Sequence, residues 1–320
     1  MKRVGEETTE RSDDRLVAAV NRVFHDVAAE YYDHSHGSIL VDEVKRWQGI
    51  AKRIGRLLDG NSLRLLDLGA GTGFVPNSVL PHLPRVQQII AVDISQEMLK
   101  RTADKLHGLG IRPQVSTVAC DASKQPLASG SISIVTANSV LHHVPDPNAC
   151  MREVRRILEP GGIFALAHEP NRRAPRNPVL LGLHLVHRVS SKLARTALHI
   201  LGAGNKGTRK PKIHTEVIRR LRAEGIIAKD SQVDAKWVAS VVDVHSPTAG
   251  QGLLREGGFD PYALVAQHFA GWECILLETY SHLGTLRPVN PLVRTGNALL
   301  KRLFPRCGWS FALVVRKPST

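Results

Sequence analysis

The 320-residue chain has no run of eighteen apolar residues, which argues against a membrane-spanning helix. Residues 1–15 are polar and lack a signal-peptide stretch, so we expect a cytoplasmic protein, with peripheral membrane contact as an alternative. The four cysteines show no CxxC spacing, which indicates reduced thiols and not a disulfide frame or zinc site. Aromatic residues make up only 5% of the chain, so platforms for stacking nucleic-acid bases are scarce.

Positive charge is abundant but unevenly placed. The net charge is +14, and residues 170–222 alone carry 13 Lys or Arg against one acid, Glu216. A local excess of positive charge of this size indicates a substrate or partner with negative charge and says nothing about the fold.

Hydrophobic spacing predicts two helices and then an alternation of strands and helices. The first helix is expected from Ser12 and the second over 41–58. Five strands and three helices then follow in alternation, which predicts right-handed crossovers and a doubly wound, mostly parallel α/β sheet. The expected strands are 64–68, 88–92, 114–119, 132–137 and 163–167, and the helices are 76–83, 96–109 and 147–158.

The alternation stops after Glu169, where a helical cap insertion is expected over 171–250. Residues 178–202 have the pattern of an amphipathic helix with one basic stripe, formed by His184, Arg188, Lys192, Arg195 and His199. A loop over 202–212 and a helix over 215–223 follow. The last part, 251–320, predicts a strand near 262–267, a lid helix from 291 and a strand over 310–316. We therefore divide the chain into an N-terminal segment 1–60, a core 61–170, the cap 171–250 and the last strands 251–320.

A glycine-rich turn follows the first expected strand. In Gly69–Ala70–Gly71–Thr72–Gly73 three alternating residues have no Cβ, which lets a ligand approach the backbone amides closely. The helix after the turn begins with unpaired N–H groups and the positive end of its dipole. The order G-x-G-x-G differs from the G-x-G-x-x-G of dinucleotide folds, which opposes a nicotinamide enzyme.

Acidic residues stand at the ends of three expected strands. Asp67, two residues before the first glycine, suits a ligand with an ammonium group. Asp93 ends the second strand and can accept both hydroxyls of a ribose. Asp121 ends the third and can accept a hydrogen bond from an exocyclic amine. Together they predict a ligand with amino-acid, ribose and adenine parts.

These residues, with Asn138–Val144 and Leu158–Gly162, resemble the successive motifs of class I S-adenosylmethionine (SAM) dependent methyltransferases. Within that family they resemble the small-molecule, methyltransferase type 11-like branch. The resemblance covers 64–169, about a third of the chain. It implies a seven-stranded, Rossmann-like sheet and SAM as cofactor.

The resemblance also implies roles around the cofactor. The glycine turn lies under the methionine part, Asn138 lines the sulfonium end, and Tyr32 belongs to a segment that closes over the site. Ile94 and Met98 pack on the adenine or ribose, with plain core packing as the alternative for Met98. The expected cofactor-binding residues are Tyr32, Asp67, Gly69, Ala70, Gly71, Gly73, Asp93, Ile94, Met98, Asp121, Ala122 and Asn138.

Methyl transfer from a sulfonium needs alignment, and a base helps when the acceptor is a hydroxyl or an acidic carbon. Four candidates follow the fourth and fifth strands: His142, His143, His168 and Glu169. Simple packing or capping by these side chains is the alternative interpretation. Adjacent histidines lack the i, i+4 spacing of helical metal ligands, so we expect no metal site.

The cap is expected to cover the acceptor site, with Asp243 and His245 as substrate contacts. Its basic charge supports two hypotheses: a pocket for an acidic or phosphate-bearing molecule, or contact with an anionic membrane while a lipid-like substrate enters. A solvated helix face is a third interpretation.

We thus expect a SAM-dependent methyltransferase that acts on a hydrophobic or anionic small molecule, natural-product or lipid-like, by O- or C-methylation. RNA or other nucleic-acid methylation is the rival activity. Residues 138–141 lack the Asn-Pro-Pro-aromatic pattern, and no Pro-Cys nucleophile is present, which disfavours nucleic acid. A non-catalytic SAM-binding scaffold is opposed by the intact glycine turn and the three acids.

Overall fold

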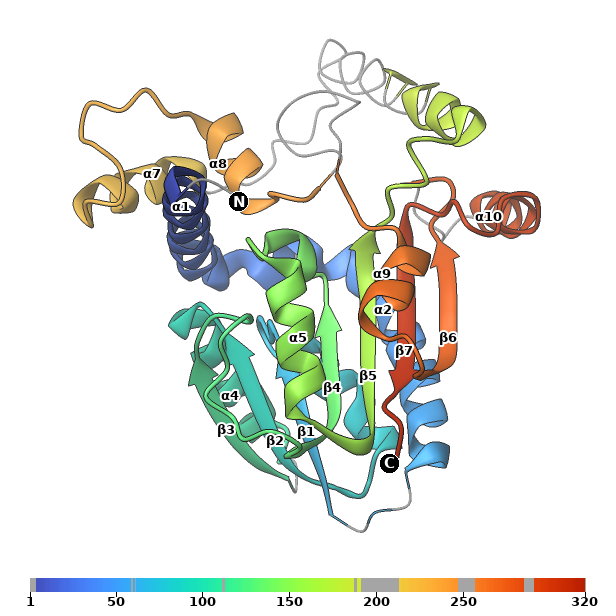
Figure 1. Cartoon of the computed structure of the whole chain (residues 1–320). Coiled ribbons are helices and arrows are strands. Elements are labelled where there is room, and N and C mark those ends of the chain that lie inside the picture. Colours follow the sequence, from blue (N-terminus) through green and yellow to red (C-terminus); the bar gives the residue numbers. More distant parts are fainter. Residues whose placement is uncertain are drawn as a thin grey trace.

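A seven-stranded sheet forms the centre of the computed structural model, which describes residues 4–58, 60, 62–110, 113–186, 189–190, 213–246, 257–284 and 291–319 (Figure 1). The strand order is β3-β2-β1-β4-β5-β7-β6. Only β7 runs antiparallel to its neighbours, so the expected doubly wound, mostly parallel fold is confirmed. The strands are β1 (Leu63–Leu68), β2 (Val86–Asp93), β3 (Gln114–Ala119), β4 (Ile132–Asn138), β5 (Leu158–Pro170), β6 (Glu273–Tyr280) and β7 (Ser310–Arg316).

The central strands are apolar because helices cover both of their faces. In β1, Leu66 pairs with Ile90 of β2 on one side and with Val135 of β4 on the other. Helices α2 (Tyr32–Leu57), α3 (Phe74–Val79) and α4 (Gln96–Gly108) contribute to the core on one face. Helices α5 (Pro147–Ile157) and α9 (Pro261–His268) cover the other face.

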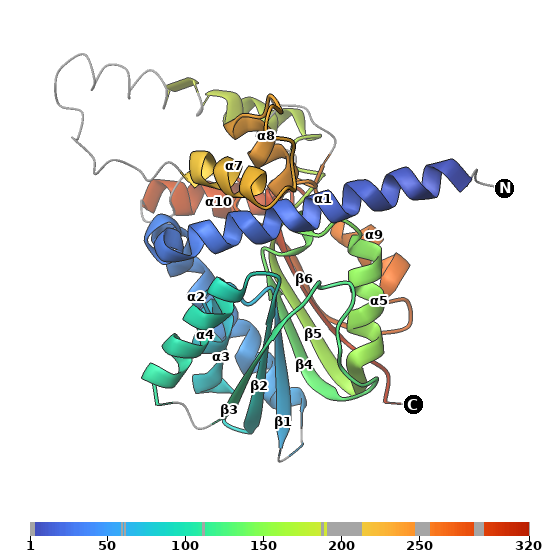
Figure 2. The same cartoon turned by 90° about the vertical axis from the view of Figure 1, so that its left-hand side faces the viewer.

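A second, smaller core joins the beginning of the chain to the cap insertion. Helix α1 (Val4–Ala28) crosses above the carboxyl ends of the parallel strands and packs against α7 (Ile213–Ala223) and α8 (Ala235–Val242) (Figure 2). Val20 and Val23 of α1 are buried there against Val217 and Val238. The cap is therefore held over the sheet partly by the N-terminal helix.

Two of the sequence-based helix boundaries are wrong. Helix α1 begins at Val4, before Ser12, and α2 begins at Tyr32, before the expected residue 41. Both helices of the N-terminal segment are therefore longer than their apolar patterns indicate. None of the described helices is long and apolar enough to cross a membrane.

The strand expected near 262–267 is also wrong, because these residues form α9. Asp260 accepts hydrogen bonds from the N–H groups of Tyr262 and Ala263, and Pro261 stands at the first helical position. A capping aspartate followed by proline is a helix-start signal, and it outweighs the β-branched and aromatic composition.

Of the five residues of the basic stripe expected over 178–202, the structure describes His184 alone. His184 is only 9% exposed, and its ring lies 4.5 Å from that of Trp309. Arg188, Lys192, Arg195, His199 and the loop 202–212 lie outside the described residues. The division of the chain into four segments stays a prediction.

Gly308 fixes how β7 approaches β6. A Cβ at this position would overlap the backbone nitrogen and oxygen of Tyr280. We expect Gly308→Ala to lower the free energy of unfolding by about 1–3 kcal/mol through overpacking. The matched variant Gly49→Ala, in α2 with open space around its Cβ, should raise it by about 0.5–1 kcal/mol. Denaturant unfolding followed by circular dichroism measures both, and an equal response would contradict this packing.

Candidate functional site

A pocket lies at the carboxyl ends of β1, β2 and β4, beneath α1. Eight of the twelve expected cofactor-binding residues line it: Tyr32, Gly69, Gly71, Asp93, Ile94, Asp121, Ala122 and Asn138. The other four, Asp67, Ala70, Gly73 and Met98, do not line it. Met98 is fully buried.

The glycine turn adopts backbone angles that other residues rarely accept. Gly69, Gly71 and Gly73 all have positive φ, at 62°, 53° and 77°. A Cβ on Gly69 would overlap the Val140 side chain, whereas a Cβ on Gly71 would meet nothing within 4 Å. The turn thus packs tightly on one side and leaves open space on the pocket side.

Asp67 is buried beside this turn without a charged partner. Its Oδ1 accepts a hydrogen bond from the Thr136 hydroxyl at 2.7 Å. No hydrogen-bond partner is found for Oδ2, which is buried. Burial raises the pKa of Asp67 to about 7. A buried carboxylate oxygen without a partner is a position that an ammonium group can satisfy.

Asp93 connects the turn to the start of α4. Its Oδ2 accepts the Gly71 N–H at 2.9 Å, and its Oδ1 accepts the Ser95 N–H at 2.9 Å. Tyr32 lies close by, and burial together with the negative charge of Asp93 raises the pKa of its phenol to about 12. Next to it, Asp33 contacts Thr72 of the turn, so the segment that begins α2 is tied to the glycine turn.

Asn138 is held by a residue outside the recognised motifs. The Trp47 indole, fully buried in α2, donates a hydrogen bond from Nε1 to Asn138 Oδ1 at 2.9 Å. The following residue, Ser139, has a φ of 60°, which is unusual for a residue with a side chain. Strained backbone of this kind is found preferentially at functional sites.

Glu169 organises the 3₁₀ turn Leu141–His143 that follows β4. Its buried carboxylate accepts the N–H groups of Val140, Leu141 and His142 at 2.6, 2.9 and 3.3 Å. The Nδ1 of the His142 ring also lies 2.9 Å from Glu169 Oε2. Burial opposes protonation of His142, but the charge and hydrogen bond of Glu169 raise its pKa above the usual 6.5.

The structure brings Asp243 to the same turn from a hundred residues away. Its Oδ1 lies 3.8 Å from His142 Nε2 and 3.3 Å from His143 Nδ1. The same Nδ1 donates to the Val242 carbonyl at 2.8 Å. His245 donates its N–H to the His142 carbonyl, and its Nε2 lies 3.1 Å from the Val144 carbonyl. The cap loop is thereby fixed to the turn.

One ring nitrogen of His142, one of His143 and a carboxylate oxygen of Asp243 all lie within 4.8 Å of one another. The i, i+4 spacing argument misses such a group, because the third residue comes from the cap. The formed contacts are those of a hydrogen-bonded chain, since a carbonyl such as that of Val242 can only accept. The expectation of no metal stays a prediction.

His168 belongs to a different cluster from the other three candidate bases. Its Nδ1 lies 3.3 Å from Glu43 Oε1, and its N–H donates to the Tyr280 hydroxyl at 2.8 Å. It does not line the pocket, and neither do His142, Glu169, Asp243 and His245, whereas His143 does. His168 is thus separated from the turn at which the other candidates meet.

Sequence reasoning expected the N-terminal helices to close over the site but missed the α1 residues that line the pocket. Ala18, Asn21 and His25 line the pocket from this helix. Asn21 is 3% exposed, and its amide donates to the His143 carbonyl at 3.3 Å. The available signal was a polar pair at i, i+4 within an otherwise apolar helix face, which predicts a polar contact of that face.

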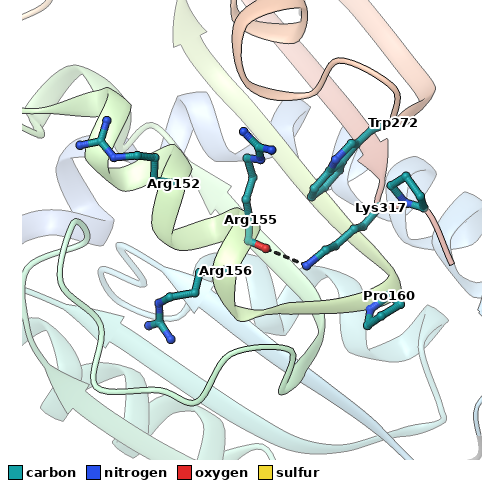
Figure 3. A pocket seen from close by; sticks show the side chains of 7 residues that line it. Arg152, Arg155, Arg156, Pro160, Trp272 and Lys317 are labelled. Carbon is teal, nitrogen blue, oxygen red and sulfur yellow. Dashed lines mark hydrogen bonds between the residues drawn. The ribbon is translucent and has the colours of Figure 1, made fainter. Parts of the chain in front are cut away.

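A second hollow, of about 450 Å³, lies around the C-terminal end of α5 (Figure 3). Its cations include Arg155 and Lys317. The Lys317 ammonium donates to the carbonyls of Arg155 and Leu158 at 2.8 and 2.7 Å. Cations at a helix C-terminus stabilise its last carbonyls, which accounts for Lys317 without a ligand.

Comparisons with known proteins agree with this geometry. Residues 66–166 match the family described as Methyltransferase domain. The ubiquinone/menaquinone biosynthesis C-methyltransferases UbiE of Pseudomonas savastanoi pv. phaseolicola and Desulfotalea psychrophila are each 32% identical over 143 residues. That match covers 45% of this chain and 55% of each relative, so the chain spans about half the length of these relatives. The chain is thus similar to methyltransferases over the stretch that holds the glycine turn, and the family match covers about a third of its length.

A solved structure of a SAM-dependent methyltransferase from Mesorhizobium loti is also similar, with a TM-score of 0.45 and 19% identity. The similarity covers 85% of this chain and 98% of that one. The family match over 66–166 contains the glycine turn, Asp93, Asp121 and Asn138, whereas α1 and Trp47 lie outside it. The matched stretch thus receives part of its pocket wall from α1, which lies outside the family match.

The raised pKa of Asp67 predicts how the stability of the folded chain depends on pH. The carboxyl titrates near 3.8 when unfolded and near 7 when folded, so its contribution to stability is lost as pH rises through this range. Asp67→Asn does not titrate. Relative to the wild type, its free energy of unfolding should therefore increase between about pH 4 and pH 8, by on the order of a few kcal/mol.

Thermal or denaturant unfolding across this pH range measures the difference. The exposed acid Asp104 supplies the control, because Asp104→Asn should follow the wild type. If the difference in free energy of unfolding between Asp67→Asn and the wild type does not change with pH, folding does not raise the pKa of Asp67.

Proposed function

We propose that the chain is a SAM-dependent methyltransferase that acts on a small, apolar acceptor. The observation that carries the proposal is the buried Asp67 oxygen without a partner, next to a glycine turn whose Gly71 side is open. These two features fit the ammonium and carboxylate of an amino-acid ligand. The acids Asp93 and Asp121 on the pocket wall fit its ribose and adenine.

SAM, when bound, supplies a methyl group that its sulfonium already activates. The chain's own part is then to hold and align, which accounts for most of the acceleration in such displacements. Asp67 would hold the ammonium group, and Asp93 the ribose hydroxyls. Asn138, oriented by Trp47, would line the reacting end of the pocket. Tyr32 and α1 would exclude water from above.

We propose His142 as the general base, with Glu169 as its positioning residue; the His142 ring does not itself line the pocket, but its centroid lies 4.0 Å from that of His143, which does. Nδ1 of the His142 ring donates a hydrogen bond to Glu169, so the neutral ring has its lone pair on Nε2. A neutral His142 can accept the proton of a hydroxyl or of an acidic carbon as the acceptor is methylated. Asp243 lies near Nε2 and would stabilise the imidazolium that results.

The acceptor class is inferred from the pocket lining and from the relatives. Apolar residues Val92, Ile94, Val140 and Val144 line the pocket, and the curated relatives are named for C-methylation in ubiquinone and menaquinone biosynthesis. An apolar ring that carries a hydroxyl or an acidic carbon fits both observations. We therefore favour O- or C-methylation of a lipid-like or natural-product acceptor over nucleic acid and over a non-catalytic scaffold.

Cofactor binding tests the first part of the proposal. Asp93→Asn keeps the side-chain shape but removes the charge, so we expect the Kd for SAM to rise by about tenfold or more, equivalent to about 1.4 kcal/mol. Calorimetric titration of the purified chain with SAM measures this. Glu97→Ala, an exposed acid at the start of the next helix, is the matched control. Equal affinities for wild type and Asp93→Asn would contradict the placement of the ribose.

The pH dependence of turnover tests the second part. Protonated His142 cannot accept a proton, so the rate should be low in acid and rise with pH through a pKa above 6.5. Glu169→Gln removes the charge that raises this pKa, so the acid limb should move to lower pH. Tritium-labelled methyl transfer to a panel of phenols and quinols, together with nuclear magnetic resonance titration of the histidines, measures the shift.

Glu159→Gln, at the opposite end of β5, is the control for a charge lost from the same strand. An acid limb that is the same in Glu169→Gln and wild type would exclude His142 as the base. Label recovered in RNA and absent from the small-molecule fraction would favour the rival activity. SAM binding without any transfer would favour the scaffold.

A further inference from the structure

Exposed large apolar side chains are concentrated in two helical segments outside the pocket. Among the described residues, eight such side chains are exposed, and six of them lie in 178–190 or in α10 (Pro291–Leu303). The two segments lie close together in both views, at the carboxyl end of the parallel strands (Figures 1 and 2). We call this the apolar–basic surface, and its exposed apolar residues are Val179, Leu183, Val186, Val189, Leu299 and Leu303.

In 178–190 the exposed apolar residues share one helix face. Val179, Leu183 and Val186 are spaced by four and three residues and are 48%, 40% and 67% exposed. Leu180 and His184 lie on another side of the helix and are buried. The helix therefore packs through one leucine and a histidine and leaves three further aliphatic side chains exposed, unlike an ordinary surface helix with a polar outer face.

Helix α10 presents apolar and basic residues together. Leu299 and Leu303 are 57% and 61% exposed at i, i+4 spacing, and Arg302 is exposed between them. The inward side is used for packing, because the Asn297 amide oxygen accepts the Leu283 N–H at 2.9 Å. The helix α10 is therefore attached to the rest of the protein on its other side, so its exposed apolar face is not explained by loose packing.

The residues between the two segments join them. The His184 ring packs on Trp309, and a Cβ on Gly284 would lie 3.2 Å from His184 Nδ1. Leu283, the neighbour of Gly284, is bonded to α10. Both segments are therefore anchored on the same two residues, Leu283 and Gly284, which places their apolar faces at one end of the molecule.

The charges of this surface have one sign. Neither 178–190 nor α10 contains Asp or Glu. Lys301 pairs with Glu278 at 2.9 Å, but no ion pair is found for Arg294 or Arg302 within the described part of the chain. Two copies of such a face would repel each other, whereas an anionic surface complements it.

We propose that the apolar–basic surface docks on an anionic lipid bilayer. The valine and leucine side chains enter the boundary between headgroups and acyl chains, and Arg294 and Arg302 lie at the level of the phosphates. This inference goes beyond the proposed function, because docking needs neither cofactor nor acceptor. Since the surface lies at the end of the sheet where the pocket is found, docking places the methyltransferase site beside the bilayer (Figure 1).

Sedimentation of the full chain with lipid vesicles tests the proposal. Vesicles of phosphatidylcholine with about one quarter phosphatidylglycerol should bind the wild type at least about tenfold more tightly than pure phosphatidylcholine. Raising NaCl from about 0.1 M to about 0.5 M should weaken binding severalfold. Leu299→Asp/Leu303→Asp should weaken it about tenfold or more, since both anchors are lost and two negative charges are added.

Matched control variants distinguish binding through this surface from nonspecific adsorption to vesicles. Leu109→Asp changes a leucine that is 54% exposed on another face and should bind vesicles like the wild type. Arg294→Glu/Arg302→Glu should lose affinity for anionic vesicles, whereas Lys52→Glu/Arg53→Glu, two exposed cations of α2, should retain most of it. Circular dichroism and SAM titration verify that each variant is folded.

Wild-type chain that stays in the supernatant with anionic vesicles at low salt would overturn the proposal. Equal binding by Leu299→Asp/Leu303→Asp and Leu109→Asp would do the same. A wild type that is dimeric by light scattering and does not bind vesicles, and becomes monomeric with Leu299→Asp/Leu303→Asp, would assign the surface to a second copy of the chain. Loss of vesicle binding leaves SAM affinity measurable, so failure here is distinguishable from failure of the proposed function.

Discussion

The buried carboxylate of Glu169 is the constraint on which the rest of the site depends. A fully buried carboxylate is unfavourable unless hydrogen bonds compensate for lost hydration, and here three backbone N–H groups and one imidazole do so. They fix the turn after β4 in one conformation. Val140 then lies against Gly69, which explains why the first glycine of the loop cannot carry a side chain.

The same turn is also where three separate parts of the chain meet. The His142 carbonyl accepts the His245 N–H from the cap, and the His143 carbonyl accepts the Asn21 amide from α1. A change at Glu169 would therefore disturb the pocket wall, the cap and the N-terminal helix together. Because a change at Glu169 affects all three parts, a loss of activity alone does not identify its role. The pH profile does, because it reports the effect of Glu169 on the pKa of His142.

The sheet and most of the residues that line the candidate pocket were predictable because they depend on local patterns. The strand 114–119 and the strand 310–316 were placed correctly from apolar runs alone, and Asp93 and Asp121 from their positions at strand ends. Contacts between distant segments were not predictable in this way. Trp47 with Asn138, Asn21 with His143, and Asp243 with both histidines join residues 91 to 122 positions apart, and no periodicity encodes such pairs.

The burial of Val20 and Val23 of α1 against Val217 and Val238 has a consequence for biosynthesis. The α1 helix leaves the ribosome before its apolar partners, which are synthesised roughly 200 residues later. At translation rates of about 5–20 residues per second, its valine face stays without a partner for roughly 10–40 s. The second core can therefore form only after β1 to β5 have been synthesised, while β6 and β7 still follow in the chain.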